Sequence, residues 1–383
     1  MKANRTICFL FFLFLIMSGC KEKKQTFELA IAVPLTGDIA AVGQGMKRAA
    51  DLAIEEANQS GRFKYPIILH AFDDRSDPKE AVNVANQITS NSNIKAIIGH
   101  LNSGCSIPAS QVYAKANMLM VTPAATNPKL TLQQLEPSWK WVKNIFRVNT
   151  TDDIQGQFVA QFIIHQLQAK TACIIQDKTP YGQGLAEEFK KEFEKQGGQT
   201  ISFDGIAIGD KDFKALLTKI KSNKPDLIYF GGIYNEGGLI LKQARELGLK
   251  TTFVSGDAMQ SPELIKLAGL AAEGAYITNV GLPPEKMPSA QSFIKRYKER
   301  YPGMDFQPYD HYTYEATMIV LLALEKSMTE TEPQAFRLKM IEFLKPLKYE
   351  GILGLTVFDE KGDTLNKTIS VYLIKNGEFV PVN

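Results

Sequence analysis

Short apolar runs alternate regularly with helical patterns through most of this chain. In the first half, apolar runs that read as strands lie at 27–35, 66–72, 95–101 and 118–126, and helical periodicity lies between them, as at Gly43–Gln59. This βαβ alternation is typical of a parallel sheet with helices on both faces. The sequence therefore predicts an α/β fold.

The same alternation restarts after an interruption at 132–153. The expected strands of this second half lie at 171–178, 200–208, 226–232, 251–257 and 275–280. Long helical patterns then occupy 289–301, 315–328 and 334–345, and 355–382 reads as antiparallel strands with polar turns. Two halves of similar plan, in a chain too long for one core, predict two lobes with a cleft between them.

One expected helix carries a specific start signal. Asp77 is placed to act as the N-cap, Pro78 stands at the first helical position, and Glu80 is spaced to close a capping box. We therefore expect a helix to begin at Pro78.

The first twenty residues read as an export leader rather than as part of the fold. Lys2 and Arg5 precede an apolar run from Ile7 to Met17, and small residues lead to Cys20. The leader resembles that of bacterial lipoproteins, which implies residues 1–19 as signal peptide, acylation of Cys20 and 20–26 as a polar tether. The alternative is a plain signal peptide cut elsewhere.

The charge balance and the cysteine usage exclude several protein classes. Removal of Lys2 and Arg5 with the leader leaves 42 basic and 41 acidic residues, which gives no electrostatic footprint for nucleic acid. Besides Cys20, the mature chain holds only Cys105 and Cys173, in separate expected halves, and we expect both to be free thiols. The exported body must therefore rely on its core rather than on disulfides.

Small polar residues follow the expected strand at 95–101. Asn102, Ser103, Gly104, Cys105 and Ser106 stand where the chain passes into the next helix. Ligands of open parallel sheets bind beyond such strand ends, and a helix N-terminus favours an anionic group. The segment therefore suits a carboxylate, although Ser103 or Ser106 could instead cap its own helix.

Three further strand ends carry polar groups. In 121–128, Thr126 and backbone carbonyls beside two prolines could accept hydrogen bonds from an ammonium, although this is also a normal proline-bounded loop. In the second half, Tyr181 and Asp257 follow two other strands, and Asp257 alone could be a turn residue or a cap. Donors on one lobe and an acid on the other would together match a zwitterion.

At these residues the mature chain resembles the periplasmic branched-chain amino acid binding proteins, the substrate-binding components of ABC importers. The segments IGHLNSGCSIPAS, TPAAT, DKTPYGQG, FGGIYNEGG and FDEKGD fall in the family's order and spacing. The resemblance implies a type I periplasmic-binding-protein fold, with two Rossmann-like lobes, three hinge crossovers and an interlobe ligand cleft. It places lobe 1 at 27–147 plus 281–353 and lobe 2 at 148–280 plus 354–383.

The resemblance also implies roles for individual residues. Ser103, with Asn102 beside it, would bind the ligand carboxylate; Ala124 and Thr126 would share the two ends of the zwitterion; and Tyr181 would close over the ligand. Asp257 stands where leucine/isoleucine/valine binders have a Glu that pairs with the ammonium, and Tyr309 falls where an aromatic residue lines the side-chain pocket. Tyr234, next to the position where those binders have Tyr, is a further candidate for ligand binding. It implies an amino acid ligand, an ABC permease as partner, a monomer, and no cofactor or metal.

Departures from the family's pattern leave the side-chain preference open. Ser76 and Asn102 replace the two cysteines of the family's disulfide, so that bridge is absent. Val42 and Ile233 stand where some members have Tyr, and the shorter Asp257 could shift the ammonium or admit a larger ligand.

Three functions are compatible with such a fold. The first is a lipid-anchored periplasmic or cell-surface protein that captures an amino acid, branched-chain or related aliphatic, and delivers it to an ABC permease. The second is a ligand sensor of the same fold for amides, aromatic acids or other small solutes. The third, an enzyme, is disfavoured because the chain lacks a complete dinucleotide loop, a G-x-S-x-G elbow and metal-ligand spacing of its four His residues.

Overall fold

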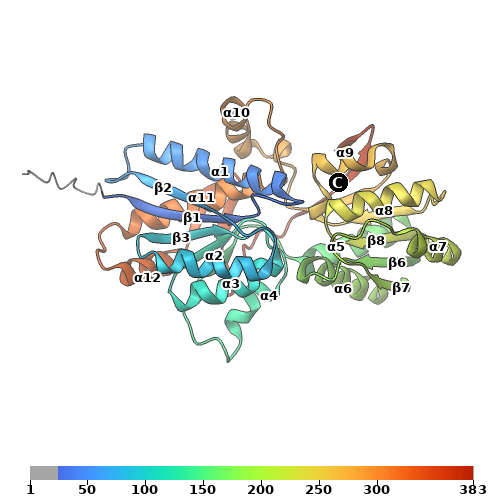
Figure 1. Cartoon of the computed structure of the whole chain (residues 1–383), viewed down its shortest axis with the longest axis horizontal. Coiled ribbons are helices and arrows are strands. Elements are labelled where there is room, and N and C mark those ends of the chain that lie inside the picture. The colour runs from blue at the N-terminus through green and yellow to red at the C-terminus, as the bar shows by residue number, and fades with distance from the viewer. Residues whose placement is uncertain (1–24, 383) are drawn as a thin grey trace, which may run out of the picture.

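The computed structural model describes residues 25–382, so the leader, Cys20 and most of the expected tether lie outside the described residues. Figure 1 shows two α/β lobes side by side, with the first half of the chain in one and the middle of the chain in the other. In the described residues, no helix is both apolar enough and long enough to cross a bilayer.

The sheet of lobe 1 has five parallel strands in the order β2-β1-β3-β4-β5. These strands are β1 (Phe27–Val33), β2 (Ile67–Asp73), β3 (Ile94–Gly99), β4 (Leu119–Thr122) and β5 (Ile145–Arg147). The helices of this lobe are α1 (Ala40–Gln59), α2 (Pro78–Ser90), α3 (Ser103–Lys115), α4 (Lys129–Leu132), α10 (Gln291–Arg300), α11 (Asp310–Ser327) and α12 (Pro333–Leu344).

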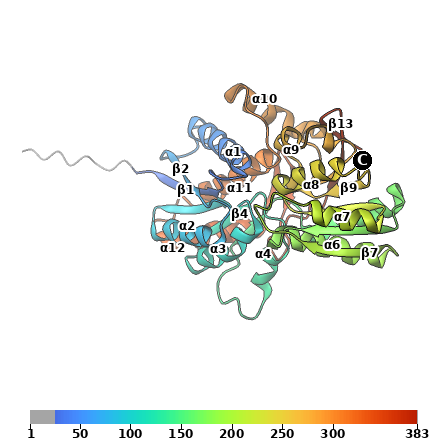
Figure 2. The same ribbon diagram turned by 45° about the vertical axis from the view of Figure 1, so that its right-hand side comes forward.

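Alternate residues of β1 enter two different cores. Leu29 and Ile31 belong to the core that includes α1, α11 and α12, whereas Ala30 and Ala32 belong to the core with α2 and α3. Because side chains alternate across a strand, a strand that is apolar at every position must be covered on both faces. The sheet therefore lies in the middle of the lobe, as Figures 1 and 2 show.

The sheet of lobe 2 has seven strands in the order β14-β13-β10-β9-β8-β6-β7. Its strands are β6 (Thr171–Gln176), β7 (Gln199–Gly205), β8 (Leu227–Gly231), β9 (Thr252–Ser255), β10 (Tyr276–Val280), β13 (Ile369–Lys375) and β14 (Glu378–Pro381). Its helices are α5 (Asp152–Phe162), α6 (Pro180–Lys195), α7 (Lys214–Asn223), α8 (Tyr234–Glu246) and α9 (Pro262–Ala268). The strands β6 to β10 run parallel, and β13 and β14 add an antiparallel edge.

The chain passes between the two sheets three times. It leaves the first sheet after β5, returns after β10 to build α10 to α12, and crosses again before β13. A two-stranded ribbon of β11 (Lys348–Gly351) and β12 (Gly354–Val357) precedes the third crossing. This topology is the type I periplasmic-binding-protein fold, as predicted.

Most sequence predictions of the fold are confirmed, and two local ones are wrong. The stretch 132–153, read as an interruption, contains β5, a strand of only three residues. At α2, Asp77 accepts from the backbone N–H groups of Lys79 and Glu80 as expected. Glu80 does not close a capping box, because the Asp77 N–H donates to the Asp74 carbonyl instead, 2.9 Å away. Both Cys105 and Cys173 are buried free thiols, as expected.

Candidate functional site

Ser103 is the first residue of α3 and lies directly beyond the carboxyl end of β3. Its hydroxyl oxygen accepts from the Asn127 N–H at 3.2 Å, so the Ser103 proton is left to donate elsewhere. The Ser106 hydroxyl donates to the His100 carbonyl at 3.4 Å, and the N-cap Asn102 makes no side-chain capping bond. Neither serine caps its own helix, so this N-terminus keeps unpaired N–H groups suited to an anion.

The loop 123–128, which carries Ala124 and Thr126, is held by its neighbours. The Thr122 hydroxyl oxygen accepts from the Ala125 N–H at 3.1 Å, and the Asn149 amide donates to the Ala124 carbonyl at 3.1 Å. Each carbonyl oxygen has two lone pairs, so that of Ala124 keeps one acceptor site. The loop therefore presents fixed backbone acceptors beside Ser103.

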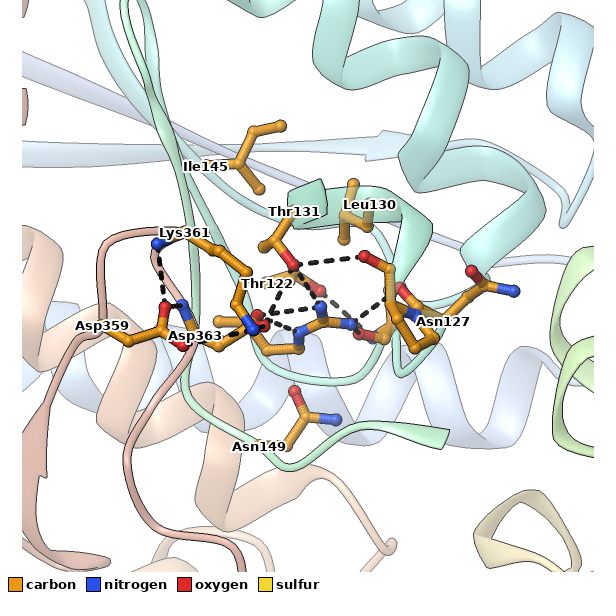
Figure 3. Close-up of polar contacts among 12 residues, drawn as sticks. Thr122, Asn127, Leu130, Thr131, Ile145, Asn149, Asp359, Lys361 and Asp363 are labelled. Carbon is orange, nitrogen blue, oxygen red and sulfur yellow. Dashed lines mark hydrogen bonds and ion pairs between the residues drawn. The ribbon is translucent and has the colours of Figure 1, made fainter. Parts of the chain in front are cut away.

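The side chain of Arg147 holds the same loop through hydrogen bonds to its backbone carbonyls. Its guanidinium donates to the carbonyls of Ala125 and Asn127, at 2.9 and 3.0 Å, and to the Thr131 hydroxyl at 2.7 Å. It also forms a buried ion pair with Asp363 at 2.8 Å. In Figure 3, Thr131 and Asp363 belong to one connected set of polar contacts with Asp359 and Lys361. The third crossing is thereby tied to the loop that carries Thr126.

Asp257 is buried at the end of β9, where it opens a short 3-10 turn (Asp257–Met259). Its Oδ1 accepts from the Tyr181 hydroxyl at 2.8 Å and from the Gln155 amide at 3.1 Å, and its Oδ2 accepts from the Tyr309 hydroxyl at 2.5 Å. Burial raises the pKa of Asp257, and the three donors oppose that rise. A carboxylate accepts about four hydrogen bonds, so one site on Oδ2 remains.

Asp152, the first residue of α5, is a second buried carboxylate near Asp257. Burial, followed by the Asp257 charge, raises the pKa of Asp152 well above its ordinary value. Among the described residues, neither of its oxygens has a direct hydrogen-bond partner, and the buried Thr126 hydroxyl lies beside it without a well-formed bond. Two acids thus share a buried region beside the Thr126 loop, which favours a cation between them.

Direct contacts close the two lobes over this region. The Asn127 amide donates to the Pro180 carbonyl at 2.5 Å, and a Cβ on Gly104 would lie only 3.3 Å from the Pro180 ring. Asn127 also touches Ser103, and Pro180 precedes Tyr181, which binds Asp257. The N-terminus of α3 therefore lies close to the start of α6, where Tyr181 binds Asp257.

The predicted site residues divide into two groups. The structure brings Tyr181 and Tyr309 onto Asp257 and places Thr126 beside Asp152, near Asp257. Ser103 and Ala124 lie in neighbouring segments of lobe 1 that Asn127 and Asn149 contact, and Asn102 is the N-cap directly before Ser103. Tyr234 does not join the hydroxyl network around Asp257, because its hydroxyl donates to the Asp38 carbonyl of lobe 1 at 3.0 Å. Tyr234 therefore forms a hydrogen bond between the two lobes.

Asp152 and Gln155 were missed by sequence reasoning. Both lie in the first turn of α5, which begins at the end of the segment 132–153 read as an interruption. The paired acids Asp152 and Asp153 ahead of an apolar helical pattern were the available signal. This signal was not used, because the acids could be assigned to a strand end only if β5 were recognised, and β5 is too short for that.

His100 is a structural residue. Its Nδ1 pairs with Asp74 at 2.7 Å and its Nε2 lies 3.0 Å from the Tyr113 hydroxyl, with all three side chains buried. No cluster of potential metal ligands occurs in residues 25–382.

Comparison with known proteins identifies the family. The model of the periplasmic binding protein family matches residues 26–378. The chain belongs to this family. Its members are solute-binding proteins that act outside the cytoplasm.

Relatives and solved structures agree with this assignment. The Leu/Ile/Val-binding protein homolog 1 of Brucella suis is 38% identical over 340 residues, which cover 88% of this chain and 86% of the relative. A leucine binding protein from Thermotoga maritima superposes with a TM-score of 0.82 at 32% identity, covering 93% of this chain and 97% of that chain. A branched-chain amino acid transporter substrate binding protein from Streptococcus pneumoniae, in complex with isoleucine, gives 0.82 at 25% identity, with 94% and 99% covered.

Proposed function

We propose that this family member captures a branched-chain or related aliphatic amino acid between its lobes and delivers it to the permease of an ABC importer. The observation that carries the proposal is the buried acidic pair of Asp152 and Asp257 close to the interlobe contact between Asn127, which touches Ser103, and Pro180, which precedes Tyr181. Relatives named for leucine, isoleucine and valine binding support the ligand class.

The hydrogen-bonding capacity of the site matches a zwitterion. An ammonium has three N–H donors, and three acceptors are available: Oδ2 of Asp257, the carboxylate of Asp152 and the carbonyl of Ala124. The ligand carboxylate would lie on the N–H groups of α3 and accept from the Ser103 hydroxyl. Both charges would then be paired inside a closed site, which offsets the cost of burying them.

We expect Ser103→Ala to weaken leucine binding by about ten- to a hundredfold. The substitution removes one hydrogen bond to a charged carboxylate, a loss of about 1.5–3 kcal/mol. Isothermal titration calorimetry with leucine measures the effect, and Ser106→Ala is the matched control because the Ser106 hydroxyl binds a backbone carbonyl. An unchanged dissociation constant for Ser103→Ala would remove this side chain from the site.

Leucine binding should release protons and strengthen as the pH rises from acid to neutral. The pKa of Asp152 and that of Asp257 are raised by burial in the free protein, and an ammonium would stabilise the ionised forms and lower both. The free protein therefore binds more protons than the complex, so affinity increases with pH until both acids are ionised. Titrations in buffers of different ionisation enthalpy count the protons, and uptake of protons on binding would contradict the proposal.

A ligand panel separates import of amino acids from sensing of other solutes. Titration with aliphatic amino acids, amides and aromatic acids should show binding of the amino acids. Tight binding of an amide or an aromatic acid, with no response to any amino acid, would support the sensor alternative instead.

We further propose that Cys20 anchors the monomeric protein to the membrane and that 20–26 is its tether. The supporting observation is the leader sequence before Cys20. We retain lobe 1 as 27–147 plus 281–353 and lobe 2 as 148–280 plus 354–383. The five-stranded and the seven-stranded sheet support this division, although the boundary at 353/354 separates the paired strands β11 and β12. Cys20→Ala should release the protein from washed membranes into the soluble fraction.

A further inference from the structure

A cavity of about 700 Å³ lies between the lobes, and its lining includes residues close in sequence to Asp257 and Tyr309. Lobe 2 contributes residues from α9 and from the C-terminal strands, and lobe 1 contributes the segment before α11. Figure 2 shows α9 and β13 near each other at the C-terminal end of the chain. This volume is in the range that drug-sized ligands occupy.

His311 is the polar group that distinguishes this cavity from an apolar groove. It belongs to the cavity lining, its exposed fraction is only 1%, and neither ring nitrogen has a hydrogen-bond partner among the described residues. Its ring stacks on Phe306 at 5.9 Å, which fixes its orientation. Burial lowers the pKa of His311 to about 3, so at neutral pH the ring offers one N–H donor and one acceptor.

The rest of the lining indicates a neutral ring compound. Five prolines, Phe306, Tyr372 and Phe379 supply flat apolar surface, and Asn279 and Gln260 add amides. The charged residues of the lining are two lysines and two glutamates, so the cavity has no net charge to attract an ion. A carboxylate or an ammonium would lose hydration here without a matching excess of opposite charge.

We propose that this cavity, with His311 as its hydrogen-bonding group, is a second binding site for a neutral aromatic or heteroaromatic amide. Two of the segments that line it also contribute to the site around Asp257. Gln260 follows directly on the 3-10 turn of Asp257, and Pro308 and His311 lie one residue before and two residues after Tyr309, which donates to Asp257. These two segments connect the cavity to the site around Asp257.

An occupant of this cavity should favour the closed arrangement of the lobes. It would touch both walls at once, beside existing interlobe contacts such as Lys266–Asp305 at 2.8 Å. Because coupling between two sites is reciprocal, an amide in this cavity should raise the affinity for leucine, and leucine should raise the affinity for the amide. This coupling, unlike the cavity site itself, rests on the proposed function.

The probe is benzamide, and methyl NMR on the intact mature protein detects its binding. We expect saturable shifts at the Ile265 methyl groups, at least tenfold weaker binding of benzoate, and about tenfold weaker binding of benzamide to His311→Phe. Phe preserves stacking on Phe306 but cannot hydrogen-bond. The exposed residue His165 supplies the matched control, His165→Phe, which should bind as the wild type does.

Two further variants show whether benzamide binds in this cavity or in the amino acid site around Asp257. Ile265→Trp, which fills the cavity, should abolish the benzamide shifts, and Asp257→Asn should retain them even if it binds no amino acid. Absence of saturable benzamide binding to the wild type, or equal binding by the wild type, His311→Phe and Ile265→Trp, would overturn the proposal. Failure of leucine to bind would contradict the proposed function while leaving the benzamide result intact.

Discussion

Asp257→Asn should weaken leucine binding by about 30- to 4,000-fold. Replacing one partner of a buried, hydrogen-bonded charge pair costs about 2–5 kcal/mol, because the other charge is left without compensation. Asn keeps the shape of Asp257 and can still accept from Tyr181 or Tyr309, so the loss reports on charge rather than on packing. Titration calorimetry with leucine and with its analogue that lacks the amino group measures the difference.

The analogue is the internal control of this experiment. A ligand without an ammonium should bind the wild type weakly and should not bind Asp257→Asn more weakly still. Asp51→Asn, at a surface pair with Lys47 on α1, is the matched variant outside the site and should bind leucine normally. Equal losses for leucine and the analogue on Asp257→Asn would show that Asp257 has no role toward the ammonium.

Asp363→Asn should destabilise the protein by about 3–5 kcal/mol, because it leaves the fully buried Arg147 guanidinium without a counter-charge. The same change should loosen the Ala125 and Asn127 carbonyls that Arg147 holds, and so weaken leucine binding. The midpoint of urea unfolding measures the first effect, and calorimetry measures the second. Asp51→Asn again serves as the control, since exposed pairs contribute little.

The pH dependence of this effect has a definite sign. Burial alone would raise the pKa of Asp363, but Arg147, the Lys367 charge and Thr131 outweigh it and hold the pKa below its ordinary value. The ion pair therefore contributes stability that is complete above the unfolded carboxyl pKa, about 3.9, and is lost as the pH falls through the folded value. Asp363→Asn should remove this part of the acid sensitivity. A variant as stable as the wild type at neutral pH would contradict the role given to the pair.

The fold could be predicted because its pattern is local. The residues of β1 from Leu29 to Val33 are all apolar, and Leu29 to Ala32 alternate between cores on opposite faces, so the strand itself shows that helices cover both sides. The sequence did not predict the start of α11, because the periodic apolar pattern begins at Glu315, whereas the helix begins five residues earlier at Asp310. The strand β5 has only Ile145, Phe146 and Arg147, which is below the length at which alternation can be recognised.

The candidate site was predictable only where a residue follows a recognisable strand. Ser103, Tyr181 and Asp257 meet that condition. Tyr181 binds Asp257, and Ser103 contacts Asn127, which reaches Pro180 beside Tyr181. Contacts between distant segments could not be predicted, such as Arg147 with Asp363 or Tyr309 with Asp257, because they depend on how the crossings return to the cleft. Asp152 was missed because β5, the strand that precedes it, is too short to recognise.

A crystal structure of the mature protein grown with leucine tests the central proposal most directly. We expect leucine between the lobes, with its carboxylate on the N-terminus of α3 and the Ser103 hydroxyl. Its ammonium nitrogen should lie within about 3.2 Å of a carboxylate oxygen of Asp257 and of Asp152. A ligand bound in the opposite orientation, or one that touches neither acid, would contradict the account.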